Sequence, residues 1–449
     1  MPVNGLPTVL ELAAELAQGK SGSRQLVEAA LARADAADGE GGRVFISLDR
    51  DEALAEAERS DRLRARGYVP SPLAGLPVSI KDLFDIAGQV TAGGSKVLAG
   101  APAAAADAAV VSRLRAAGAI LVGRTNMTEF AYSGVGLNPH HGTPGNPHDR
   151  SRIPGGSSSG AAVSVGTRMA VMGLGTDTGG SVRIPAAYCG IAGFKPTQAR
   201  IPLDGCLPLS KSLDSIGPLA PSIACCAIVD SILAGAAVRP PVAPPLHGLR
   251  LGVIRNHVME DLDATVSRAF ERALAKLSMA GAVVKDVLLP ELDRVPEINA
   301  AGGFAAAEAF AWHRELLTTR GDSYDPRVAI RIRRGAAISA ADYLALVETR
   351  AEVRHAVSAR TRIWDAVVLP TVANVAPPIE ALDTDEAYAR YNALSLRNTL
   401  IGNFLDRPAA SVPCQEEGEL PVGFMLMGES GADHRVLDIA QAVETTLGR

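Results

Sequence analysis

Apolar residues recur at helical spacing through the first part of the chain. Residues 8–18 and 23–31 place apolar side chains at helical spacing, and a third helix is expected at residues 50–66. We therefore predict that residues 1–70 form a helical segment that packs on a larger core built from residues 71–449.

Short apolar runs bounded by glycine or proline follow, and they are typical of buried strands. The first, residues 75–82, ends in Lys81 and Asp82, although charged residues rarely terminate a buried strand. A helical pattern at 109–117 and another apolar run at 119–123 come next, and this alternation predicts a sheet with crossover helices. Further strands are expected at residues 249–253, 365–371, 409–413 and 422–427, and further helices at residues 265–279 and at the C-terminal end.

Three stretches depart from this alternation. Residues 138–193 are rich in Gly, Ser, Thr and Pro, and we interpret them as a long loop-like stretch of functional importance. Residues 215–238 nearly reach the length of a membrane span but are expected to form a buried loop and helix, because they contain two prolines and a central charge: Pro218, Pro221 and Asp230. A Pro-rich connector near residues 239–246 leads into the second half.

The composition is that of a globular protein. The chain has 449 residues, of which 47% are hydrophobic and 21% charged, and its formal net charge is -5 without any long basic run. Neither a nucleic acid nor a membrane is therefore an expected partner, whereas a small molecule is. The N-terminus lacks a basic region followed by an apolar stretch, which favours a cytoplasmic location.

The cysteines and histidines do not follow the spacing of metal ligands. The five cysteines include no C-x-x-C pair, so we interpret them as reduced thiols. The eight histidines show no H-E-x-x-H spacing. We expect neither a metal ion nor an organic cofactor.

The Gly-rich stretch allows three chemical interpretations. Gly156-Ser-Ser-Ser-Gly160 has the G-x-S-x-G pattern of a nucleophile elbow centred on Ser158, but the residues before it make a poor strand. Gly134-Val-Gly136 and Gly173-Leu-Gly175 do not complete G-x-G-x-x-G, which disfavours a dinucleotide site. The third interpretation combines three residues from separate motifs: Lys81, Ser157 and Ser181.

Those motifs resemble the motifs of the amidase signature family. The resemblance runs densely from about residue 73 to residue 219. It implies a single α/β/α fold, with a mixed, twisted sheet of about ten strands that helices cover on both faces. The matching pieces are Val78-Ser-Ile-Lys-Asp82, Gly123-Arg-Thr-Asn-Met-Thr-Glu-Phe130, Pro154-Gly-Gly-Ser-Ser-Ser-Gly160, Gly175-Thr-Asp-Thr-Gly-Gly-Ser-Val-Arg-Ile-Pro-Ala186, Cys189-Gly-Ile-Ala-Gly-Phe-Lys-Pro-Thr197 and Ser212-Leu-Asp-Ser-Ile-Gly-Pro218.

The resemblance implies a Ser-cis-Ser-Lys triad. Ser181 would be the nucleophile, Ser157 the bridging serine after a cis peptide bond, and Lys81 the base. A serine hydroxyl needs a neighbour that takes its proton, and a lysine does this only when burial keeps it neutral. Because a hydroxyl both donates and accepts, Ser157 can relay the proton.

The family pattern also implies an oxyanion hole made by main-chain N–H groups. Thr178, Gly179, Gly180 and Ser181 would supply it, since glycines allow the close approach that such donors need.

Further residues are expected to support this site. Tyr132, Ser133 and Ser158 are candidate substrate contacts, with core packing or loop hydrogen bonds as alternatives, and Asp177 with Arg183 is expected to form a buried ion pair. Cys189 has no His partner and is expected to be a buried thiol. The acyl pocket is expected from residues 203–209, 302–314 and 372–391.

The predicted function is hydrolysis of a linear carboxylic amide to an acid and ammonia or an amine, through an acyl-enzyme on Ser181. The alternative is the glutamine-hydrolysing component of a glutamyl-tRNA amidotransferase, the A subunit, which resembles the same family and releases ammonia into a partner protein. Residues 136–141 and the Ala-rich region 298–346 do not fit that alternative well. A non-catalytic binding protein is disfavoured because all three triad positions are present. If the chain forms oligomers, a homodimer is expected from general frequency.

Overall fold

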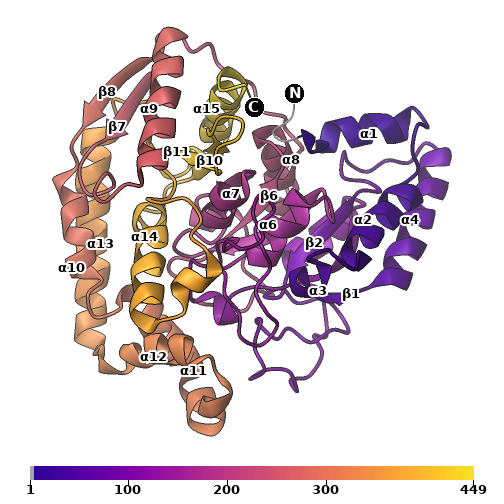
Figure 1. Ribbon diagram of the computed structural model, residues 1–449, viewed down its shortest axis with the longest axis horizontal. Coiled ribbons are helices and arrows are strands. Elements are labelled where there is room, and N and C mark those ends of the chain that lie inside the picture. The colour runs from indigo at the N-terminus through magenta and orange to yellow at the C-terminus, as the bar shows by residue number, and fades with distance from the viewer. Residues whose placement is uncertain (1–4, 449) are drawn as a thin grey trace.

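A mixed sheet of eleven strands runs through the computed structural model, which describes residues 5–448 (Figure 1). The strand order is β1-β3-β2-β4-β6-β5-β10-β11-β9-β7-β8. The strands are β1 (Phe45–Leu48), β2 (Pro77–Lys81), β3 (Ile120–Thr125), β4 (Met172–Asp177), β5 (Ala192–Lys195), β6 (Ser215–Ala220), β7 (Arg250–Ile254), β8 (Val283–Val287), β9 (Ala366–Pro370), β10 (Ala409–Pro413) and β11 (Gly423–Met427).

Helices connect and cover these strands. The α-helices are α1 (Val9–Ala17), α2 (Ser23–Asp35), α3 (Gly41–Val44), α4 (Arg50–Ala65), α5 (Ala109–Ala116), α6 (Ser159–Gly166), α7 (Arg183–Cys189), α8 (Ile223–Ala234), α9 (Ala264–Met279), α10 (Val295–Ile298), α11 (Gly303–Arg320), α12 (Pro326–Arg333), α13 (Ala340–Thr361), α14 (Asp385–Phe404) and α15 (Asp433–Thr446). Short 3₁₀ turns lie at Glu129–Ala131, Gln198–Arg200, Pro290–Arg294, Gly321–Ser323, Arg334–Ala337 and Ile379–Leu382.

The two faces of the sheet bury different groups of helices. Successive strand side chains point to opposite faces, so Phe424 and Leu426 of β11 join an apolar cluster with α1, α5, α8, α9 and α15. Met425 and Met427 join a second cluster with α13 and α14 on the other face. The α/β fold with helices on both faces is therefore confirmed, with eleven strands instead of about ten.

The N-terminal segment contributes to the sheet as well as to the helical layer. Strand β1 pairs antiparallel with β3 at one edge of the sheet, beside helices α2 and α4. The expectation of helices alone in this segment is therefore wrong at residues 45–48. A four-residue strand between two helices has too few residues to show a reliable alternation.

The Gly-rich stretch 138–193 is not the long loop expected from its composition. It contains α6, β4 and α7 and reaches the start of β5. Its small residues reflect close packing: a Cβ at Gly160 would lie 2.4 Å from the Val44 carbonyl oxygen, and one at Gly173 would lie 2.8 Å from that of Ala161. Glycine here permits neighbouring elements to approach closely. Because the same small residues are also common in loops, their composition alone suggested a loop.

The expected loop and helix at residues 215–238 are a strand and a helix. Strand β6 occupies the first part between β4 and β5, and α8 follows. No helix within residues 5–448 is long and apolar enough to cross a membrane.

The Pro-rich residues 239–246 contain no helix or strand, and strands from both sides of them belong to the same sheet.

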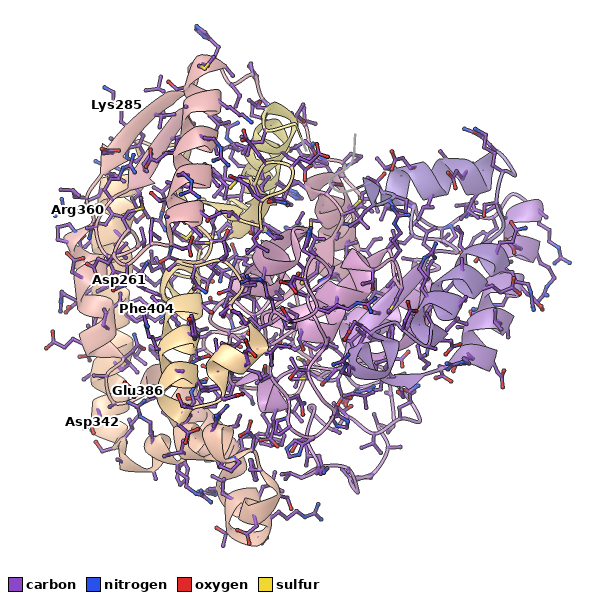
Figure 2. All side chains as sticks on the ribbon, viewed as in Figure 1. Asp261, Lys285, Asp342, Arg360, Glu386 and Phe404 are labelled. Atoms are coloured by element: carbon purple, nitrogen blue, oxygen red, sulfur yellow. The ribbon has the colours of Figure 1, made fainter. Side chains whose placement is uncertain are left out.

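The exposed side chains of Lys285 on β8 and of Asp342 and Arg360 on α13 project from the outer edge of the second half (Figure 2). Phe404, at the end of α14, is 1% exposed and packs in the core of that half.

Candidate active site

Three strands bring the candidate residues to one edge of the sheet. Strands β2 and β4 are parallel neighbours, so their carboxyl ends, at Lys81 and Asp177, lie at the same edge. Strand β6 runs antiparallel to β4 and begins opposite Asp177, at Ser215. Residues that follow β2 and β4 therefore meet residues that precede β6.

Lys81 lies fully buried at this edge. Its Nζ donates hydrogen bonds to Ser157 Oγ and to Thr176 Oγ1, both at 2.7 Å. Burial lowers the pKa of Lys81 from 10.5 to about 7, and the nearby charges of Asp177 and Asp214 only partly oppose this shift. A large share of the side chain is therefore neutral near pH 7.

Ser157 and Ser181 come from neighbouring segments of the Gly-rich stretch. The peptide bond between Gly156 and Ser157 is cis, as the family resemblance implies. The Ser158 N–H donates to the carbonyl oxygen of Ser181 at 3.3 Å, which joins the two segments. Ser157 is fully buried beside Lys81, whereas Ser181 is 3% exposed and lines a cavity.

The stretch from Thr178 to Ser181 presents free main-chain donors. Its four N–H groups have no acceptor within residues 5–448. Gly180 has φ +135°, and a Cβ there would lie 2.1 Å from Thr399 Oγ1, so only glycine fits. The Thr399 hydroxyl donates to the Gly179 carbonyl oxygen at 2.7 Å and holds the stretch from α14.

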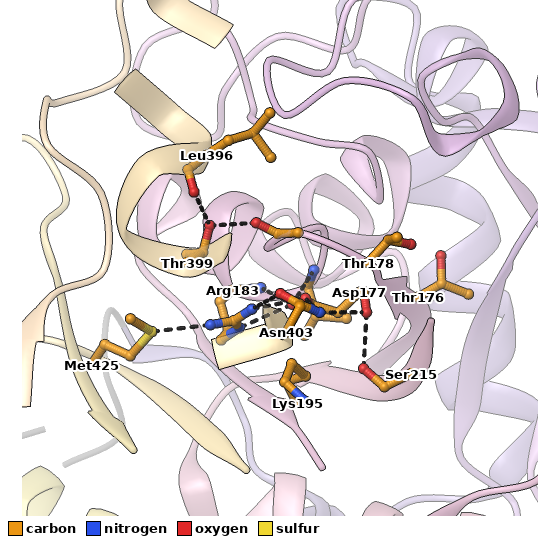
Figure 3. Close-up of polar contacts among 12 residues, drawn as sticks. Thr176, Asp177, Thr178, Arg183, Lys195, Ser215, Leu396, Thr399, Asn403 and Met425 are labelled. Carbon is orange, nitrogen blue, oxygen red and sulfur yellow. Dashed lines mark hydrogen bonds and ion pairs between the residues drawn. The ribbon is translucent and has the colours of Figure 1, made fainter. Parts of the chain in front are cut away.

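The ion pair expected between Asp177 and Arg183 is present, and both side chains are fully buried (Figure 3). Arg183 Nη2 lies 2.8 Å from Asp177 Oδ1 and also donates to Asn403 Oδ1 at 2.7 Å. Burial raises the pKa of the Asp177 carboxyl, but the guanidinium of Arg183 outweighs this and lowers it to about 2. The pair fixes the turn that carries Ser181.

A second buried carboxylate supports the same turn, and sequence reasoning did not single it out. Asp214 accepts a hydrogen bond from Thr178 Oγ1 at 2.5 Å and from the N–H groups of Leu209 and Ser210 at 3.0 Å. Burial, with the charge of Glu308, raises the pKa of Asp214 to about 6. The only available signal was its position just before strand β6, within a motif of the family resemblance.

A cavity of about 200 Å³ opens beside Ser181. Tyr132 and Ser133 line it, but Ser158 does not, and the Ser158 hydroxyl donates to the Thr176 carbonyl oxygen at 3.4 Å. Of the segments expected to form the acyl pocket, residues 203–209 and 302–314 contribute Leu209, Gly302 and Ala305. Residues 372–391 instead line a larger neighbouring cavity.

Several residues around the site were missed by sequence reasoning. Thr176 stands in the Gly-rich motif, but nothing in the motif shows that its hydroxyl meets Lys81. The others lie far from the motifs along the chain, on α14 and around α12, and only folding brings them here: Leu396, Thr399, Leu400, Asn403, Arg331 and Arg334.

None of the five cysteines, all of which lie within residues 5–448, forms a disulfide bond. Cys189 is buried, its thiol donates to the Pro154 carbonyl oxygen at 3.4 Å, and burial raises its pKa. No group of three or more His, Cys, Asp or Glu side chains in these residues could hold a metal ion.

Comparisons with known proteins show similarity along nearly the whole chain. The family model described as Amidase matches residues 25–437. The chain is 37% identical to 2-amino-5-chloromuconic acid deaminase of Comamonas testosteroni, over 90% of this chain and 88% of that protein. It is 35% identical to the A subunit of the glutamyl-tRNA(Gln) amidotransferase of Chloroflexus aggregans, over 96% and 94% of the two chains. A crystal structure of an amidase superposes with a TM-score of 0.88 at 34% identity and covers 98% of this chain and 99% of its own.

Proposed function

The chain belongs to the amidase signature family of amide-hydrolysing enzymes, and on this premise we propose that it hydrolyses a linear carboxylic amide to the acid and ammonia or an amine. Ser181 is the proposed nucleophile, Ser157 the proton relay and Lys81 the base. One observation carries the proposal: a fully buried lysine, with its pKa lowered to about 7 by burial, lies 2.7 Å from the hydroxyl of Ser157.

In the first step the Ser181 Oγ attacks the amide carbonyl carbon. Its proton passes to Ser157, while Ser157 gives its own proton to the neutral Lys81. The carbonyl π electrons move to the oxygen, which becomes an oxyanion. The free N–H groups of residues 178–181 are available to stabilise this charge.

The tetrahedral intermediate then collapses. The oxyanion re-forms the carbonyl and the C–N bond breaks, and the leaving nitrogen takes a proton from Ser157, which Lys81 replaces. The product at this stage is ammonia or an amine and an ester on Ser181. Water attacks the ester, loses its proton to the same relay, and releases the acid as Ser181 regains its proton.

Ammonia release from a panel of amides tests this function. The panel includes short aliphatic and aromatic amides, amino-acid amides, amide acids and glutamine, with Ser181→Ala as the parallel variant. We expect turnover by the wild-type protein and at least a roughly 10³-fold loss in the variant, with unchanged thermal unfolding. Equal ammonia release by both proteins would refute the assignment of Ser181 as the nucleophile.

The amidotransferase role remains the second candidate, because the chain is 35% identical to such a protein over 96% of its length. In that role it would cleave glutamine and pass ammonia to further subunits. Cleavage of glutamine alone, together with other proteins that co-purify in fixed stoichiometry, would support it. Turnover of a simple amide by the isolated chain would support the stand-alone amidase.

A further inference from the structure

Two arginine side chains lie in the wall of the reaction cavity. Arg331 and Arg334 line the cavity together with Ser181 and the oxyanion stretch, and no Asp, Glu or Lys among residues 5–448 lines it. Building on the proposed function, we propose that these two arginines bind a carboxylate of the substrate. The substrate is then an amide acid, with the scissile amide at Ser181 and a negatively charged group at the arginines.

The two guanidinium groups have main-chain partners but no carboxylate partner within residues 5–448. Arg331 Nη1 donates to the Tyr132 carbonyl oxygen, and its guanidinium stacks 4.5 Å from the centre of the Tyr132 ring. Arg334 Nη2 donates to the Ala300 carbonyl oxygen. Each guanidinium has five N–H donors, so one such bond leaves donors for a ligand while it fixes the group in place.

A neighbouring arginine shows the contrast. Arg327, one turn before Arg331 on α12, pairs with Asp385 at 2.8 Å, and its guanidinium lies 4.6 Å from the Tyr388 ring centre. Its charge is therefore compensated within the chain. Arg331 and Arg334 have no such compensation, and the positive charge of both reaches Tyr132, where it opposes the rise in pKa that burial causes.

The remaining wall of the cavity suits the hydrocarbon part of an amide acid. Its four leucine side chains come from the loop before β6 and from α14: Leu209, Leu213, Leu396 and Leu400. Arg331 and Arg334 also line the neighbouring cavity of about 850 Å³, so they stand where the two cavities meet. A carboxylate at this boundary can keep contact with solvent while the apolar spacer is buried.

Binding to the Ser181→Ala protein tests the anion site independently of turnover. Calorimetry would compare succinamate and glutaramate with butyramide and valeramide, in which a methyl group replaces the carboxylate. We expect the amide acids to bind at least about tenfold more tightly, since hydrogen bonds to charged groups contribute that much. Equal affinity for acids and neutral amides, or no binding of either acid, would overturn the proposal.

Four single substitutions in the same background locate the effect. Arg334→Gln and Arg331→Gln should each weaken the binding of amide acids about tenfold and leave the affinity for neutral amides unchanged. Arg333→Gln is the matched control, because it removes the same charge from an exposed neighbour that lines neither cavity. Arg331→Lys keeps the positive charge but removes the guanidinium that stacks on Tyr132. This variant therefore distinguishes the effect of the charge from the effect of packing. A loss in Arg333→Gln as large as in Arg334→Gln would refute a specific site.

Turnover of the same amides by the wild-type protein is measured separately as ammonia release. Carboxylate-dependent binding without ammonia release would refute the proposed hydrolysis and keep the anion site. Rapid turnover of neutral amides and of amide acids alike would support hydrolysis and reject the site.

Discussion

Two buried lysines at strand ends show what turns a lysine into a base. Lys81 ends β2 and Lys195 ends β5, each is at most 1% exposed, and burial lowers the pKa of the first to about 7 and of the second to about 8. Lys81 donates to the hydroxyls of Ser157 and Thr176, whereas Lys195 donates to the Pro196 carbonyl oxygen at 2.6 Å.

The difference lies in the partners. A carbonyl oxygen only accepts, so Lys195 has no proton to receive from the atom that it contacts. A hydroxyl can return a proton to the amine, so Lys81 has a route for proton transfer. Burial therefore prepares both lysines, but only the hydroxyl partners give one of them a place in acid–base chemistry.

Removal of the amine should have very different effects at Lys81 and at Lys195. We expect Lys81→Met to lower kcat/KM by about 10³-fold or more, because general base catalysis and the activated nucleophile are both lost. Lys195→Met should keep most of the activity, since within residues 5–448 its amine donates a hydrogen bond to a carbonyl oxygen and to no hydroxyl. Steady-state kinetics on one good amide measures both, and comparable losses in the two variants would contradict the distinction.

The pH dependence tests the protonation state of Lys81. The base acts when neutral, so below its pKa of about 7 kcat/KM should fall about tenfold per pH unit. Above that pKa the rate should level off. The pH profile is measured only where circular dichroism shows a folded protein, and a flat rate down to pH 5.5 would argue against a neutral lysine base.

Thr176 is the second hydroxyl partner of Lys81. Thr176→Val keeps the shape of the side chain but removes one hydrogen bond, and we expect kcat to fall about tenfold. Thr176→Ser keeps the hydroxyl and should recover most of that loss. If both variants behave alike, the role of Thr176 is packing and not orientation of the amine.

Asp214 should give the smallest effect, seen as a displacement of the pH profile. Its negative charge raises the pKa of Lys81, so Asp214→Asn should move the acid limb to lower pH by a fraction of a unit. It should also lower kcat, because it disturbs the contact with Thr178. Glu308→Gln is the matched control, because the charge of Glu308 acts on Asp214 and is not among the charges that act on Lys81. This variant should leave the acid limb of the pH profile nearly in place.

Local patterns predicted those parts of the molecule whose signal lies within a few neighbouring residues. The strand that ends in Lys81, the strands near residues 250, 366, 409 and 423, and the helix at residues 264–279 follow from short apolar runs and helical spacing. The Gly-rich stretch was misjudged, because the same small residues serve loops and tightly packed helices such as α6. Close approach of Gly160 to Val44 is a contact between distant segments, and no local pattern records it.

The family, the α/β class and the candidate residues Lys81, Ser157 and Ser181 could be predicted before folding was considered, because they stand in contiguous motifs whose residue types are readable one by one. The groups that surround these residues come from distant segments and could not be predicted in this way. Thr399 reaches Gly179 from 220 positions away, and Arg331 and Arg334 come from a separate segment to the cavity beside Ser181. The physical reason is that burial, charge compensation and hydrogen-bond partners are properties of neighbours in space, and folding alone sets those neighbours.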